Sequence, residues 1–172
     1  ATLAVDKSFT AYRRRIGLDE GNEVMVESPF NYAEQTRLYL PNDLPEPNSP
    51  DFVEAAIDRA SDLISASGGG AFVLCTSYHM LQAMKRELQP MTGLRILTQG
   101  DAPRSQLLRT FREDGHAVLV ATLSFWQGVD VPGSALRLVV IDKIPFASPG
   151  DPLVEARIEL IRSRGGSPFS QY

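Results

Sequence analysis

The sequence predicts an α/β fold in which a mostly parallel sheet is covered by helices on both sides. From residue 51 onward, short apolar segments alternate with longer segments that have helical spacing. The apolar segments are continuous runs, such as Ala-Phe-Val-Leu-Cys at 71–75, and do not alternate with polar residues. Continuous runs are typical of strands that are buried on both faces, as in a parallel sheet between two helical layers.

The first fifty residues are predicted to form a helix, two short strands and a loop. Ser8 is suited to begin the helix, and Gly17 is a typical residue to end it. Residues 23–28 and 36–40 alternate in hydropathy as half-buried strands do. Four prolines lie within residues 41–50, which predicts a loop or linker.

Residues 51–172 are predicted to form one α/β lobe, to which residues 1–50 are attached. Helices are expected at 51–67, 77–89, 102–114 and 151–164, and strands at 71–75, 94–98, 117–122 and 136–142. Ser77 and Asp151 are expected to cap the helices that follow them. The three glycines at 68–70 precede a strand and are expected to form only a turn.

Polar residues follow each predicted strand of the lobe. They are Thr76 with Ser77, residues 99–101, residues 122–130, and Asp142 with Lys143. The carboxyl ends of parallel strands lie at one edge of the sheet, and ligands of open α/β sheets bind at that edge. We therefore expect these four clusters to converge on one side of the molecule.

Composition argues against several classes of function. With 172 residues, 43% of them hydrophobic, the chain is long enough for one core, but its net charge of −4 does not indicate a charge-driven nucleic-acid binder. One cysteine excludes an internal disulfide, and two histidines are too few to indicate a zinc site. No apolar run of membrane-spanning length is present, so we expect no membrane partner and a cytoplasmic setting.

Three stretches carry a resemblance to a known family. They are FVLCTSYHML, ILTQGDAPRSQLLRTFRE and VLVATLSFWQGVDVPGSALRLVVIDKIPFASPGDPLVEAR. Together they resemble the second RecA-like motor domain of superfamily 2 DNA helicases, in the DinG-type, XPD-like branch. The resemblance covers residues 70–172. The Phe-Trp-x-Gly-Val-Asp form and the Pro-Phe-x-x-Pro segment are the features that narrow it to this branch.

The two ends of the chain fit the same resemblance. Ala-Thr-Leu at 1–3 resembles the end of the family's motif III, and the chain stops at Ser-Pro-Phe-Ser-Gln-Tyr, before motif VI is expected. The resemblance thus implies an excised C-terminal fragment whose lobe, residues 51–172, is truncated before motif VI. It implies a RecA-like three-layer sandwich. That sandwich has no phosphate-binding loop of its own, since the sequence contains no G-x-x-x-x-G-K-[ST] motif.

The resemblance also implies an activity for the parent protein. That protein would be an ATP-dependent DNA helicase that hydrolyses ATP, acts in DNA repair or replication and moves 5′ to 3′. ATP and Mg²⁺ would be bound mainly by the missing first RecA-like lobe, and single-stranded DNA would lie across both lobes. The fragment itself is expected to hold no complete catalytic set, no metal and no cofactor, and to be inactive alone.

Four polar residues are predicted to contact DNA. They are Thr76, Ser77, Gln99 and Thr122. Their hydroxyl, amide and backbone N–H groups suit phosphate oxygens without adding charge. The alternative for Thr76 and Ser77 is that they only cap a helix. Arg104, Arg109 and Arg112 either add positive charge near the DNA or form a solvated helix face.

The segment after the third strand of the lobe holds the remaining predicted site residues. Phe125 or Trp126 is predicted to stack on a base, and the alternative is that both rings pack in the core. Gly128 and Asp130 are predicted to face the nucleotide cleft. Glycine allows close approach of the backbone, and the carboxylate would hold the ribose or orient an arginine finger. The alternative for Asp130 is a turn residue.

Two other classes of function stay open from the sequence. A stand-alone small-molecule enzyme would use Cys75 or His79 at a strand end, and thiol labelling would show whether Cys75 is accessible. A non-catalytic interaction module would use residues 1–50 as a docking arm. It would bind its partner without any dependence on DNA.

Overall fold

The computed structural model describes residues 3–145 and 150–167 of the chain. Residues 1–2, 146–149 and 168–172 lie outside the described residues, and they include parts of the segments that carry the family resemblance. The chain divides into two compact units, Ala1–Asn42 and Asp43–Tyr172.

The first unit differs from the sequence-based prediction. Helix α1, Thr10–Ile16, ends at Gly17 as predicted, and Gly17 takes a left-handed conformation. The predicted strands at 23–28 and 36–40 are absent, and a short helix, α2 (Tyr32–Gln35), lies between them. No described side chain of this unit is buried. A strand pair without a buried apolar face is only marginally stable, which explains why these segments form no sheet.

The second unit contains a parallel sheet, which confirms the predicted α/β class. Its strands are β1 (Ala71–Leu74), β2 (Ile96–Thr98), β3 (Val118–Ala121) and β4 (Leu138–Ile141), in the order β2-β3-β1-β4. β1 and β3 are buried along their whole length, as continuous apolar runs predict. β4 lies at an edge and is covered on one side only, since Val139 and Ile141 are 49% and 46% exposed.

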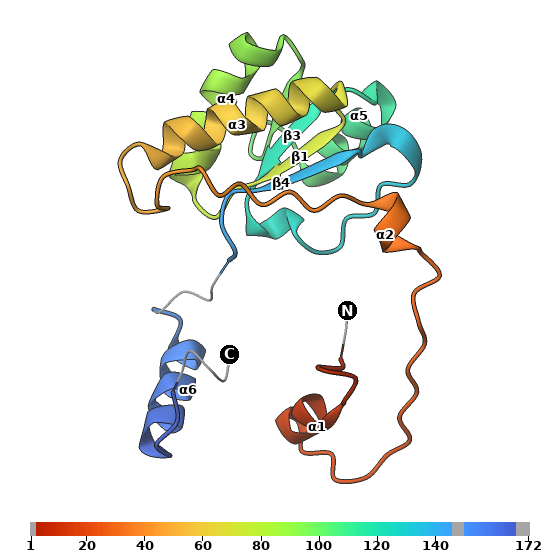
Figure 1. Cartoon of the computed structure of the whole chain (residues 1–172), viewed down its shortest axis with the longest axis vertical. Coiled ribbons are helices and arrows are strands. Elements are labelled where there is room, and N and C mark those ends of the chain that lie inside the picture. Colours follow the sequence, from red (N-terminus) through yellow and green to blue (C-terminus); the bar gives the residue numbers. More distant parts are fainter. Residues whose placement is uncertain (1–2, 146–149, 168–172) are drawn as a thin grey trace. The chain divides into compact units, whose positions relative to one another are not determined.

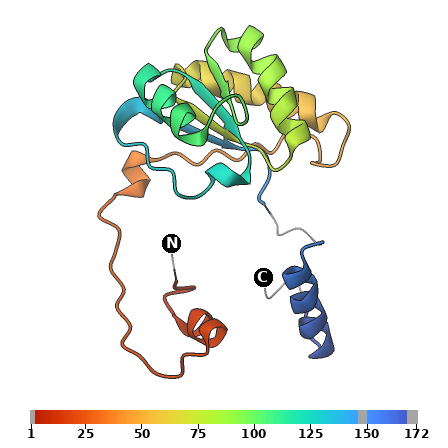
Figure 2. The same cartoon turned by 180° about the vertical axis from the view of Figure 1, so that it is seen from behind.

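Helices cover both faces of this sheet. Helices α3 (Phe52–Ser67) and α4 (Tyr78–Thr92) lie over one face, and α5 (Arg104–Asp114) lies over the other (Figures 1 and 2). Alternate residues of β1 belong to two separate cores, Val73 to that of α3 and α4 and Phe72 to that of α5. The connection from β1 to β2 and the next one, from β2 to β3, run in opposite directions along the sheet. Right-handed crossovers therefore place α4 and α5 on opposite faces.

The segments after β3 contain two short turns and a last helix. Two 3₁₀ turns, η1 (Leu123–Phe125) and η2 (Gly133–Ala135), connect β3 to β4. Helix α6 spans Pro152–Ser163, close to its predicted bounds. The Asp151 carboxylate accepts hydrogen bonds from the backbone N–H groups of Leu153 and Val154, at 2.8 and 3.3 Å. The structure therefore confirms the prediction that Asp151 is the N-cap of α6.

The proline-rich segment before α3 forms no helix or strand, as predicted, but its second part is tied to the lobe. Arg59 of α3 makes an ion pair with Asp43 at 2.8 Å. Lys143 Nζ, just beyond β4, donates to the Pro47 carbonyl oxygen at 2.7 Å. These contacts attach the segment from Asp43 onward to the lobe rather than leaving it as a free linker.

The glycine turn at 68–70 joins α3 to β1 where the backbone is closely packed. All three residues have positive φ. A Cβ on Gly69 would lie 2.0 Å from the His116 carbonyl oxygen, whereas a Cβ on Gly68 would meet nothing within 4 Å. Arg137 secures the turn by donating from Nη2 to the Gly68 carbonyl oxygen at 2.9 Å. The turn therefore fixes where β1 enters the sheet.

Gly69→Ala should destabilise the lobe more than Gly68→Ala. Both substitutions force alanine into a left-handed conformation, at a cost of about 1–2 kcal/mol. Only Gly69→Ala also drives a methyl group into a backbone oxygen, which should add about 1–3 kcal/mol. Urea unfolding followed by circular dichroism measures both free energies of unfolding. Equal losses in the two variants would contradict the close approach at Gly69.

Candidate functional site

The neighbouring strands β1 and β3 form the switch point of the sheet. The chain leaves β1 toward β2 through α4, and leaves β3 toward β4 through a turn that packs against the α5 side. Open α/β sheets bind ligands between strands whose connections leave in opposite directions. Thr76 and Ser77 follow β1, and Thr122 follows β3. The Cys75 N–H donates to the Ala121 carbonyl oxygen at 2.8 Å, so the two strand ends lie side by side.

Thr76 is held by Asp142, which follows the edge strand β4. Asp142 Oδ1 accepts from the Thr76 N–H at 2.9 Å, and Oδ2 accepts from the Thr76 hydroxyl at 3.0 Å. Oδ1 also accepts from the Lys143 N–H at 2.8 Å. Both hydrogen-bond donors of Thr76 are thus used inside the lobe. The predicted donation from Thr76 to a DNA phosphate does not agree with this arrangement, in which Thr76 joins β1 to β4.

Thr122 is held in the same way by Gln99, which follows β2. Gln99 Oε1 accepts from the Thr122 N–H at 2.8 Å and from its hydroxyl at 3.0 Å. The predicted donation from Thr122 to a phosphate is therefore also taken up within the lobe. Gln99 Nε2 donates to the Tyr78 hydroxyl at 3.3 Å. One N–H of the Gln99 amide is left for a ligand, because a primary amide has two. The structure brings Gln99 and Thr122 together as predicted, but as partners of each other.

Ser77 and Tyr78 are exposed at this edge of the sheet. Ser77 Oγ accepts from the Met80 N–H at 3.1 Å, which confirms the predicted cap of α4. Capping uses the oxygen and leaves the hydroxyl proton available to a phosphate. Tyr78 is 64% exposed. Tyr78 is not among the site residues predicted from the sequence. The signal that could have indicated it is an aromatic residue directly after a capping serine at the end of a strand.

The two aromatic residues after β3 lie in the core that faces α5. Phe125 is 4% exposed and belongs to that core, so the prediction that it stacks on a base does not agree with the structure. Trp126 is half-buried against the same core, and its indole Nε1 is enclosed without a hydrogen-bond partner among the described residues. Both rings therefore support the turn, which is the alternative that the sequence left open.

Gly128 and Asp130 lie on the exposed side of the same turn. Gly128 has a φ of +66°, a conformation that favours glycine. The Asp130 carboxylate makes no hydrogen bond or ion pair within the described part of the chain, while its carbonyl oxygen accepts from Arg112 Nη2. An exposed, unpaired carboxylate is free to bind a hydroxyl group or a cationic side chain. The arrangement is compatible with the predicted place of both residues at a nucleotide cleft.

Cys75 directly follows β1 and Asp142 directly follows β4, and burial shifts the pKa of both groups. Burial raises the pKa of the Asp142 carboxyl above its usual range, while hydrogen bonds from Thr76 and Lys143 act in the opposite direction. Burial, and then the charge of Asp142, raise the pKa of the Cys75 thiol to about 12. Cys75 is completely buried. A thiol in this setting does not act as a nucleophile, which argues against a stand-alone enzyme that uses Cys75.

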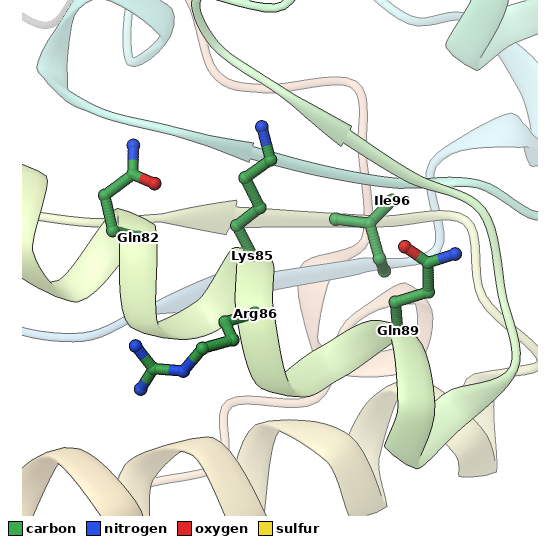
Figure 3. Close-up of a pocket in the computed structure, with 5 residues that line it drawn as sticks. All are labelled: Gln82, Lys85, Arg86, Gln89 and Ile96. Carbon is green, nitrogen blue, oxygen red and sulfur yellow. The ribbon is translucent and has the colours of Figure 1, made fainter.

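An open depression lies between α4 and the edge strand β2. It is lined by Gln82, Lys85, Arg86 and Gln89 of α4 and by Ile96 of β2 (Figure 3). Its two cations are engaged elsewhere, since Lys85 pairs with Asp101 at 2.6 Å and Arg86 with Glu87 at 2.6 Å. The depression therefore offers no concentrated charge for a ligand.

Two properties of the described residues concern metal and membrane binding. Residues 3–145 and 150–167 hold no group of three or more His, Cys, Asp or Glu side chains that could bind a metal ion. No described helix is both long enough and apolar enough to cross a membrane.

Comparison with known proteins shows the family to which the chain belongs. Residues 60–172 match the family described as the helicase C-terminal domain. The chain belongs to this family. The match covers the whole sheet with α4, α5 and the turn after β3. It confirms the predicted resemblance, and the parallel α/β fold agrees with a RecA-like helicase C-terminal domain.

Several curated proteins are similar over nearly the whole chain. An ATP-dependent DNA helicase YoaA from Haemophilus influenzae is 43% identical over 99% of the chain and 27% of its own length. An ATP-dependent helicase DinG from Mycobacterium tuberculosis is 38% identical over 98% of the chain and 26% of its length. A 3'-5' exonuclease DinG from Bacillus subtilis is 34% identical over 98% of the chain and 19% of its length. The chain thus spans about a quarter or less of these relatives.

The Cys75 thiol should be unreactive in the folded chain. With a pKa of about 12 in place of 9.0, the thiolate fraction at pH 8 falls roughly a thousandfold. Labelling with Ellman's reagent at pH 8 should therefore be at least about 1,000 times slower in the native chain than in urea. Native labelling as fast as that of the unfolded chain would contradict the buried position of Cys75. It would also support the alternative of a stand-alone enzyme that uses Cys75.

Proposed function

We propose that this chain is the C-terminal motor lobe of an ATP-dependent DNA helicase of the DinG type. Its carboxyl edge would hold single-stranded DNA and form one face of the ATP cleft. The observation that carries the proposal is the switch point, where Thr76 and Thr122 are locked by Asp142 and Gln99. This locking presents a fixed polar edge at the place where open α/β sheets bind ligands. Similarity to proteins named as ATP-dependent helicases supports the choice of reaction.

The DNA contacts would come from the exposed part of this edge. The Ser77 hydroxyl and the remaining N–H of Gln99 are neutral donors suited to phosphate oxygens, which carry no sequence information. Tyr78 presents an exposed aromatic ring held at its hydroxyl by Gln99. Base stacking on such a ring tolerates any sequence, as a translocating protein requires. We therefore transfer the proposed stacking from Phe125 and Trp126 to Tyr78.

The nucleotide contacts would come from the turn after β3. Asp130 has the free carboxylate, and Gly128 allows close approach of the backbone. The carboxylate would accept hydrogen bonds from the ribose or orient an arginine finger supplied from outside these residues. ATP and Mg²⁺ would be held mainly by the first RecA-like lobe, because this chain has no phosphate-binding loop. Movement from 5′ to 3′ and a role in DNA repair or replication belong to the same proposal.

ATP hydrolysis tests the nucleotide part of the proposal. In the helicase polypeptide that contains this chain, Asp130→Asn should lower DNA-stimulated kcat at least about tenfold, because a positioned charge is lost. Asp58→Asn is a matched control on the exposed side of α3 and should leave kcat unchanged. The 172-residue chain alone should hydrolyse no ATP. Turnover by that chain alone, or equal rates in the two variants, would contradict the proposal.

Strand affinity tests the DNA part. Tyr78→Ala should weaken binding of a single-stranded oligonucleotide by about 1–3 kcal/mol, the usual value of base–aromatic stacking. Tyr78→Phe retains the ring and loses only the hydroxyl, so it should retain most of the affinity. Fluorescence anisotropy with a labelled oligonucleotide at fixed salt measures both variants. If both variants lost affinity equally, the hydroxyl would be the important group, and stacking on Tyr78 would be excluded.

A further inference from the structure

The turn after β3 cannot fix its own conformation. Residues 127–131 make no backbone–backbone hydrogen bond with any described residue. Within the first part of the turn, the Phe125 N–H donates to the Thr122 carbonyl oxygen at 3.0 Å. An exposed segment without backbone hydrogen bonds opens at low free-energy cost unless side chains hold it. The position of Asp130 must therefore depend on contacts from other elements.

Val129 and Val131, which flank Asp130, are half-buried against the core that faces α5. The hydrogen bonds from side chains to the turn come from one continuous segment, residues 99–112. Gln99 holds Thr122 where the turn begins. Arg104 Nη2, at the start of α5, donates to the carbonyl oxygens of Gln127 and Gly128, at 2.7 and 3.1 Å. Arg112 Nη2, near the end of α5, donates to the Asp130 carbonyl oxygen. The segment after β2 thus holds the turn after β3 by side-chain hydrogen bonds at three successive points.

Arg104 has the most extensive of these contacts. Its guanidinium carbon lies 5.3 Å from the centre of the Phe125 ring, in a cation–π contact with a buried ring. The same guanidinium donates to two carbonyl oxygens of the exposed loop. Arg104 therefore joins a fixed part of the core to the loop that carries Asp130. Arg109, five residues further along α5, is exposed and makes no hydrogen bond or ion pair with the described residues.

We propose that Arg104 is a positioning residue, which sets the conformation of residues 127–130 and thereby the place of the Asp130 carboxylate. Its consequence for ATP hydrolysis rests on the proposed function, but its effect on the loop does not. Arginine suits this task because its planar fork donates in fixed directions while its face stacks on an aromatic ring. Lysine retains the charge and loses both the fork and the flat face. Helix α5 and the turn after β3 would then move as one unit.

Trp126 makes the proposal testable in the 172-residue chain, because it is the only tryptophan and lies within the turn. Arg104→Gln should shift Trp126 emission to longer wavelength and raise its acrylamide quenching constant about twofold, since the turn loses its anchors. Arg104→Lys should give a smaller shift in the same direction. Arg109→Gln, the matched control, should give the native spectrum. Circular dichroism confirms that each variant is folded, and Arg104→Lys serves as the test if Arg104→Gln is not.

A second measurement separates this inference from the proposed function. In the helicase polypeptide, Arg104→Gln should lower DNA-stimulated kcat about tenfold, because Asp130 is displaced, and Arg104→Lys should restore part of the loss. A fluorescence change without any DNA-stimulated hydrolysis in the native polypeptide would contradict only the helicase assignment. Native Trp126 emission and quenching in folded Arg104→Gln would overturn the positioning role, whatever the enzymatic result.

Discussion

Parallel pairing of β1 with β3 is the interaction on which the rest of the structure depends. The register joins Ala71 to Val118 and Leu74 to Ala121, so the two strands end together. Both strands are buried on both faces, which gives this pair the strongest apolar stabilisation in the sheet. Because the chain leaves them in opposite directions, their common end is open to a ligand. The threonines that follow are adjacent for this reason.

The carboxyl edge combines rigidity with exposure. Thr76 donates its hydrogen bonds to Asp142, and Thr122 donates its own to Gln99. These bonds connect the edge strands β4 and β2 to the central pair, β1 and β3. The groups left for a ligand are the Ser77 hydroxyl, the Tyr78 ring, one N–H of Gln99 and the exposed residues of the turn after β3. A binding site works best when its ligand groups are mounted on a rigid frame, and this edge has that arrangement.

The same separation between a fixed frame and exposed ligand groups explains the contacts of the arginines of α5. The sequence presents them as charges near DNA or as a solvated face, and both interpretations treat α5 as a surface. Arg104 and Arg112 instead point at carbonyl oxygens of the neighbouring turn. Guanidinium groups replace the backbone hydrogen bonds that a glycine-containing turn does not make, while Phe125 and Trp126 supply its apolar support.

The sequence by itself determined the α/β class, the order of the elements in the lobe, the caps at Ser77 and Asp151, and the family, because these depend on local periodicity and on motifs. Tertiary structure alone decided which of the predicted site residues have hydrogen-bonding groups left for a ligand. Thr76 and Thr122 meet their acceptors 66 and 23 residues away, and Phe125 is buried by a helix that precedes it in the chain. The unpaired segments at 23–28 and 36–40 show the same limit, since alternation predicts a strand but only a buried partner stabilises one.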